Sequence, residues 1–297
     1  MVAKDCLFDP KERTYMGYPD KGEPHFDFLN RSAWDKVKVV RETLEIWFAR
    51  IPERKRKSIR SMFCSDDRQH TGALLELVTH EILCAIGYEV EADPKVDGKT
   101  PDYAATCQDA TVIVECTVVQ ESDRDFDGAQ SENASSLDTR EPGVSIKVGV
   151  LGVDIQLSKA TKKKAWKYRN VDSQFALVVG GHRWFSHEQA IIHALFGRNT
   201  FRDPRSFFGT STEPKNVHVS GVLFKSFDVE GSVWDLCRPQ LPWEFVHNPR
   251  AMAPMKRGVF PFATEWILES GTRNKIEPTR TLNDVLGLSD PWPPRGK

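Results

Sequence analysis

The chain has 297 residues, of which 39% are hydrophobic and 28% charged, and its formal net charge is -1. This composition, with a mean hydropathy of -0.46, indicates a folded, water-soluble protein that is long enough for one large domain or two small ones. A net charge near zero excludes a global basic field that would draw nucleic acid to the whole surface, so any such site must be a local patch.

The cysteines and the apolar runs indicate the cellular compartment in which the protein acts. Its six cysteines form no Cys-x-x-Cys pair, which argues against a zinc ribbon or a disulfide scaffold and indicates a reducing compartment. The N-terminal segment MVAKDCLFDPKERTY lacks the apolar run of a signal peptide. No apolar run approaches the ~20 residues of a membrane span. We therefore expect a cytoplasmic protein without membrane contact.

Residues 1–66 are expected to form an N-terminal arm and helix. Residues 1–31 are rich in Pro, Gly and charge, which is typical of irregular chain. A helix follows, with Ser32 as its N-cap, because apolar residues then recur every three or four positions. The basic run at residues 54–60 is interpreted as a solvated helix end; the alternative is a patch that contacts phosphates.

Residues 67–228 carry the strongest periodicity and are expected to form the core. A helix ended by Gly87 is followed by three short strands, a polar loop, a Lys-rich helix, a buried strand, a further helix after Ser186 and another strand. The expected helices cover residues 67–86, 153–169 and 187–197, and the expected strands cover residues 88–92, 102 onward, 111–119, 175–181 and 217–227. This order predicts an α/β (α+β) fold in which helices flank a mixed sheet. Residues 229–297, dense in Pro and Trp, are expected to be an extension packed on this core.

Three acids fall where this geometry could bring them together. Glu76 lies on the central helix, Asp102 follows Pro101 at the start of the second strand, and Glu115 lies inside the third strand. Strand alternation places Glu115 and Thr117 on the same face. A carboxylate in an otherwise apolar strand is costly to bury unless it meets a cation or a metal ion.

The order Pro101-Asp102, then Glu115-Cys116-Thr117, behind a helix that carries Glu76, resembles the PD-(D/E)XK nuclease superfamily. The resemblance covers residues 67–181 and implies a restriction-endonuclease-like αβββαβ core. It also implies metal-dependent phosphodiester hydrolysis, on DNA rather than RNA, in a restriction or anti-phage context. Its metal, Mg²⁺ or Mn²⁺, would be held by Asp102, Glu115, the Cys116 carbonyl and Glu76.

Thr117 departs from the family pattern, which has Lys at this position. In the family that Lys orients the attacking water and stabilises the transition state, whereas Thr carries no charge. In some branches the Lys has moved to the helix after the third strand, and Lys159 and Lys163 are the candidates here because they are four residues apart and share a helix face. Lys164 and Tyr168 also have the spacing of the Gln-x-x-x-Tyr element of some branches, with Lys in place of Gln.

The change at Thr117 leaves a second hypothesis open. The chain would then be a nuclease-fold module that has lost catalysis and binds nucleic acid or a partner protein. A third hypothesis is a structural subunit whose C-terminal extension docks onto another chain. The geometry of Glu76, Asp102 and Glu115 separates them. Acids that converge with a Lys pointing in favour catalysis, and acids that are splayed or paired with Arg favour a binding module.

Overall fold

The computed structural model describes residues 6–108, 110–119, 161–182, 188–197, 206–210, 212–227, 243–269 and 271–288. Within these ranges the chain forms a mixed sheet of eight strands that lie side by side in chain order. The strands are β1 (Glu89–Ala92), β2 (Tyr103–Cys107), β3 (Ala110–Val119), β4 (Gln174–His182), β5 (Gly221–Phe227), β6 (Trp243–His247), β7 (Ala263–Glu269) and β8 (Thr272–Ile276).

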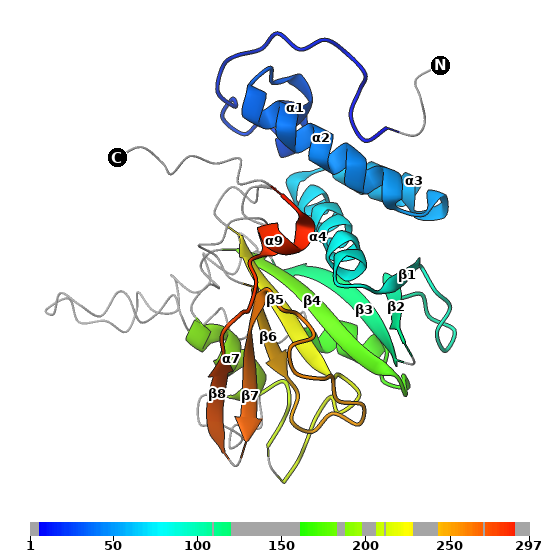
Figure 1. Ribbon diagram of the computed structural model, residues 1–297, viewed down its shortest axis with the longest axis vertical. Helices are drawn as coiled ribbons and strands as arrows, with labels where there is room; N and C mark the ends of the chain where they lie inside the picture. Colours follow the sequence, from blue (N-terminus) through cyan, green and yellow to red (C-terminus); the bar gives the residue numbers. More distant parts are fainter. Residues whose placement is uncertain are drawn as a thin grey trace, which may run out of the picture.

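The helices are α1 (His25–Arg31), α2 (Asp35–Arg50), α3 (Glu53–Phe63), α4 (Asp67–Ala85), α7 (Glu188–Phe196) and α9 (Leu282–Leu286), and residues 161–167 are also helical. Figure 1 shows α1, α2 and α3 at one end of the molecule, with α4 between them and the sheet. None of the helices in the described ranges has the length and apolar character to cross a membrane.

The first four strands follow the expected pattern. β1, β2 and β3 form an antiparallel meander, and β4 then lies parallel to β3. A parallel neighbour requires a crossover connection, and helical residues 161–167 lie within this one. The predicted α/β mixed sheet flanked by helices is confirmed.

Alternation along β3 separates two cores. Val112, Val114 and Cys116 pack in the cluster that contains the apolar face of α4. Ile113 and Val119 point to the other face and join the cluster that contains the helical segment 161–167 and α7. Glu115 therefore faces the second core, as its odd-numbered position in the strand predicts.

The N-terminal region differs from expectation in two details. Residues 1–31 are not irregular throughout, because His25–Arg31 form α1 and bury Leu29. The next helix, α2, has Trp34 as its N-cap rather than Ser32. The Ser32 hydroxyl instead accepts the Trp34 N–H at 3.3 Å, at the junction where α1 ends.

The C-terminal segment is part of the sheet and not an extension laid over it. It supplies β6, β7 and β8, and α9 packs on α4. All five residues of β6 are buried, which is the burial pattern of a strand covered on both faces. Trp243, Phe245, Phe260 and Phe262 of this segment fill the core between the sheet and the helices.

His70 joins α4 to the end of α3. The residue is 1% exposed, and its Nδ1 donates to the Phe63 carbonyl at 2.8 Å. Burial lowers the pKa of His70 from 6.5 to about 4. The folded protein therefore holds the neutral ring at a pH where the unfolded chain is already protonated.

This shift predicts acid sensitivity. Because the unfolded chain binds the extra proton, the stability that His70 contributes is complete above pH 6.5 and is lost as the pH falls toward about 4. Urea unfolding should show a loss of about 3 kcal/mol over that range from this group. His70→Phe, which stays packed on Phe63 but cannot titrate, should remove that part of the pH dependence. Equal pH slopes in both proteins would contradict the assignment.

Candidate active site

The register of β2 and β3 brings Asp102 to Glu115. The last ladder pair at that end of β2 joins Tyr103 to Val114, so Asp102 lies one position further on, opposite Glu115. There Asp102 Oδ2 accepts the Cys116 N–H at 2.7 Å. The Asp102 side chain, one residue before β2 begins, thus satisfies an amide of β3.

Glu115 is buried and surrounded by donors from one helix. Its side chain is 2% exposed, and Lys164 Nζ lies 2.6 Å from Oε1. Lys167 Nζ lies 3.4 Å from the same oxygen, and the Tyr168 hydroxyl lies 2.7 Å from Oε2. Both oxygens of this carboxylate therefore have a protein partner.

The lysine beside Glu115 is Lys164 and not Lys163. Lys163 is exposed, because one residue along a helix turns the side chain by ~100°. Lys159 lies outside the described residues. The spacing of Lys164 and Tyr168 was the signal in the sequence, since residues four apart share a helix face and these two meet the same carboxylate.

A second group of charges lies on the α4 side of Asp102, around Lys55. This α3 lysine is 3% exposed, so the interpretation of residues 54–60 as a solvated helix end is wrong for it. Its Nζ lies 3.0 Å from Glu76 Oε2, 3.0 Å from Asp93 Oδ1 and 3.4 Å from Asp102 Oδ1. Glu76 therefore reaches the site through Lys55.

Sequence reasoning missed both Lys55 and Asp93. Lys55 is spaced with Ile59 and Phe63 at intervals of four, which is the buried stripe of α3, so a cation in this stripe was a detectable signal. Asp93 follows β1 directly, and its N–H donates to the Asp102 carbonyl at 3.0 Å. The end of β1 therefore places a third carboxylate beside Asp102.

The two groups of charges act on each other through Asp102. Burial and the charge of Glu115 raise the pKa of Asp102 above its ordinary value. Burial and the charge of Asp102 raise the pKa of Glu76 to about 7. Burial alone would lower the pKa of Lys55, but the charges of Glu76 and Asp102 raise it. Burial would likewise lower the pKa of Lys164, but the charge of Glu115 outweighs it and raises this pKa.

Thr117 and Cys116 play smaller parts than the acids. Thr117 is half-buried on the same face of β3 as Glu115 and supplies no charge. Cys116 contributes its N–H to Asp102, while its buried thiol lies 3.6 Å from the Thr79 hydroxyl in the opposite core. The backbone N–H of Cys116 therefore helps to position the Asp102 carboxylate.

Asp102 and Glu115 are the two acids of the site that a metal ion such as Mg²⁺ would use. Within the described ranges, no group of three or more His, Cys, Asp or Glu side chains is arranged to hold a metal ion. Mg²⁺ needs only one or two carboxylates, since it keeps several waters. Asp102 and Glu115 supply two such carboxylates at opposed positions, and their mutual repulsion is what a divalent cation relieves. The carboxylates of Glu76 and Glu115 are both already bound by a lysine, Lys55 and Lys164 respectively, so a metal ion at either one would have to share or displace that lysine.

Comparison with known proteins identified no relative of this chain. No protein-family model, no curated protein and no solved structure matches the chain. Function must therefore be inferred from the residues of the site.

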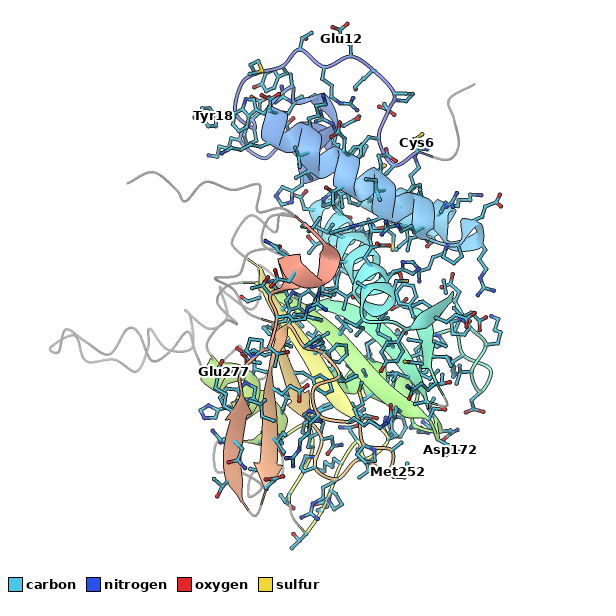
Figure 2. The ribbon with its side chains drawn as sticks, in the orientation of Figure 1. Cys6, Glu12, Tyr18, Asp172, Met252 and Glu277 are labelled. Atoms are coloured by element: carbon cyan, nitrogen blue, oxygen red, sulfur yellow. The ribbon has the colours of Figure 1, made fainter. Side chains whose placement is uncertain are left out.

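Removing the Tyr168 hydroxyl should destabilise the protein. This hydroxyl lies 2.7 Å from Glu115 Oε2 and 2.9 Å from the Thr100 carbonyl, and the ring is 1% exposed. Tyr168→Phe leaves a buried carboxylate oxygen without this donor, which should lower the free energy of unfolding by about 1–3 kcal/mol in urea titrations. The control is Tyr18→Phe, because Tyr18 is 79% exposed on the N-terminal arm, away from the sheet (Figure 2). Equal stability of the two variants would exclude a structural role for this hydroxyl.

Proposed function

We propose that the chain is a metal-dependent nuclease that hydrolyses phosphodiester bonds in DNA. The observation that carries this proposal is the ammonium of Lys164 against Glu115, with Asp102, the residue before β2, opposite Glu115. This lysine supplies the positive charge that Thr117 lacks. The resemblance of the Asp102 and Glu115 segments to the PD-(D/E)XK superfamily supports the same reaction, and a restriction or anti-phage context belongs to the same proposal.

Hydrolysis of a phosphodiester requires an activated water and neutralisation of charge on the phosphate. Mg²⁺ or Mn²⁺, when held by Asp102 and Glu115, would polarise a phosphate oxygen and acidify a bound water. The chain's own residues divide the remaining tasks. Lys164 places a fixed positive charge where the phosphate develops negative charge, the Cys116 N–H holds Asp102, and Tyr168 fixes the orientation of Glu115.

The same helix offers an exposed aromatic ring for a nucleic acid strand. Trp166 is 68% exposed, and the guanidinium of Arg169 lies 4.2 Å from the centre of its ring. Lys163, also exposed, precedes Trp166 by three residues and so shares its outward face. An aromatic face among cations is suited to stacking on a base while the cations contact phosphates.

One observation favours a second function, a nuclease-fold module that binds nucleic acid or a partner protein without cleaving. Glu115 is paired with Lys164 and Lys167, and Glu76 and Asp102 are paired with Lys55. Charges that are neutralised by the protein itself have less need of a metal ion. Turnover by the purified wild type decides between the two functions.

Cleavage should depend on Lys164 and not on Lys163. With Mg²⁺ or Mn²⁺ and saturating DNA, Lys164→Met should lower kcat by about a hundredfold or more, because a donor to the developing charge is lost. Lys163→Met is the matched control: at saturating DNA it should keep the wild-type kcat, and its position on the outward face beside Trp166 should show only as a higher KM. Glu115→Gln should remove cleavage as well. A wild type that is inert on single- and double-stranded DNA and RNA with either metal would refute the nuclease and favour the binding module.

Metal binding has its own readout. Mg²⁺ or Mn²⁺ should raise the melting temperature of the wild type by mass action, since the ion binds only the folded site. Asp102→Asn, which keeps the shape of the side chain but removes a charged oxygen, should abolish most of this rise. An unchanged metal-dependent shift in the variant would contradict the proposed donor pair.

Nucleic acid binding should depend on Trp166. Loss of one stacked base costs ~1–3 kcal/mol, so Trp166→Ala should weaken the binding of a fluorescent single-stranded DNA by roughly tenfold or more. Arg169→Ala should weaken it less and reduce its salt dependence. Tyr18→Ala removes an equally exposed ring on the N-terminal arm and should change nothing. Affinity that is independent of salt would argue against phosphate contacts.

A further inference from the structure

Cys84 and His80 lie on one face of α4, in its C-terminal part. They are four residues apart, and the Cys84 sulfur is 3.9 Å from Nε2 and 4.0 Å from Nδ1 of the His80 ring. Cys84 is exposed, whereas His80 is only 4% exposed. An imidazole enclosed in the protein therefore borders a sulfur that reaches the solvent.

The His80 ring is oriented by a carboxylate from the same helix. Nδ1 lies 3.2 Å from Glu81 Oε1, and because a carboxylate only accepts hydrogen bonds, this nitrogen carries a proton. The other Glu81 oxygen accepts a hydrogen bond from Arg50 of α2 at 2.7 Å. Of the described residues, only Cys84 offers Nε2 a partner, its sulfur. A nucleophilic atom beside a histidine that a third group orients is the arrangement by which proteins activate a weak nucleophile.

The charges around His80 favour a protonated ring. Burial alone would lower the pKa of His80, but the Cys84 sulfur and the Glu81 carboxylate outweigh it and raise this pKa from 6.5 to about 9. The Tyr103 ring centre lies 5.7 Å from that of His80, and burial raises the pKa of the Tyr103 hydroxyl, so this neighbour stays neutral. The negative end of the α4 dipole opposes a thiolate at Cys84, but a partial charge acts less strongly than a full positive charge in contact with the sulfur. A thiolate at Cys84 therefore depends on His80.

We propose that Cys84 is a modification site at which a thiolate, held by the His80 imidazolium, exchanges with small-molecule disulfides. The Cys84 sulfur attacks one sulfur of the disulfide, so that a new S–S bond forms at Cys84 and the S–S bond of the reagent breaks. The electron pair of the broken bond leaves with the departing thiolate, which takes a proton from the solvent. Cys84 is oxidised and the disulfide is reduced, so no further oxidant is required. This site uses none of the acids of the candidate active site and does not depend on the proposed nuclease.

Cys64 provides an internal comparison, because it is also exposed but desolvation raises the pKa of its thiol. The protein is treated with oxidised glutathione at pH 7, and mass spectrometry of its peptides follows each cysteine. An ordinary thiol is only a few per cent thiolate at this pH, so Cys84 should form its mixed disulfide at least about tenfold faster than Cys64. His80→Gln, which removes the charge, should lower the rate at Cys84 by about threefold or more and leave the rate at Cys64 unchanged. A smaller difference in either comparison would overturn the proposal.

A second measurement covers the case in which His80→Gln does not fold. Cys84→Ser changes an exposed position and leaves His80 in place. Because the sulfur raises the pKa of His80, an NMR titration of the ring should give a lower pKa in Cys84→Ser than in the wild type. Cys64→Ser is the matched control and should leave this titration unchanged. The same His80 pKa in Cys84→Ser and the wild type would show that the sulfur and the ring do not interact, and would equally overturn the proposal.

Discussion

The charge of Asp102 is the constraint that the site depends on. Its carboxylate contacts the Lys55 ammonium with one oxygen and the Cys116 N–H with the other, and Glu115 lies opposite on β3. Two carboxylates so close together cannot both stay ionised in a dry interior without cations. Two lysines, one on each side of the sheet, supply these cations. Lys55 approaches from the α4 side of the sheet, and Lys164 approaches from the opposite core.

This arrangement couples the fold to the chemistry. α3 is outside the region that resembles a nuclease core, yet its buried lysine neutralises Glu76 and Asp102. The N-terminal region is thereby part of the site and not an accessory to it. The helix after β3 has a comparable role, since its inward face supplies Lys164 and Tyr168 to Glu115 while Trp166 remains exposed on its outer face.

The same pairing explains why two functions compete. A lysine bound to a buried glutamate is fixed in position, which is what electrostatic stabilisation of a transition state requires. It is also already neutralised, so under the proposed function a phosphate would share Lys164 with Glu115. The balance between these effects would depend on how much charge a metal ion brings to Asp102 and Glu115. An enzyme and a binding module can therefore differ very little in side-chain geometry.

The sequence alone determined the elements whose signals are local. Helical periodicity predicted α4, and Gly87, with φ of 93°, lies in the left-handed region that its role after the helix requires. Alternation predicted the face of β3 on which Glu115 lies. Asp102 and Glu115 were predicted to meet because they belong to consecutive strands of a meander, whose register depends on a short stretch of chain.

Only the tertiary structure decided which cations meet these acids and where the C-terminal segment goes. Lys164 rather than Lys163 faces Glu115 because the rotation of a helix about its axis is set by what it packs against, and a difference of one residue changes the face. Lys55 reaches Asp102 through contacts between segments far apart in the chain. β6, β7 and β8 join the sheet through pairing that begins at the edge of β5. Such long-range contacts leave little local pattern in a sequence, because the partners that stabilise them are brought together only when the chain folds.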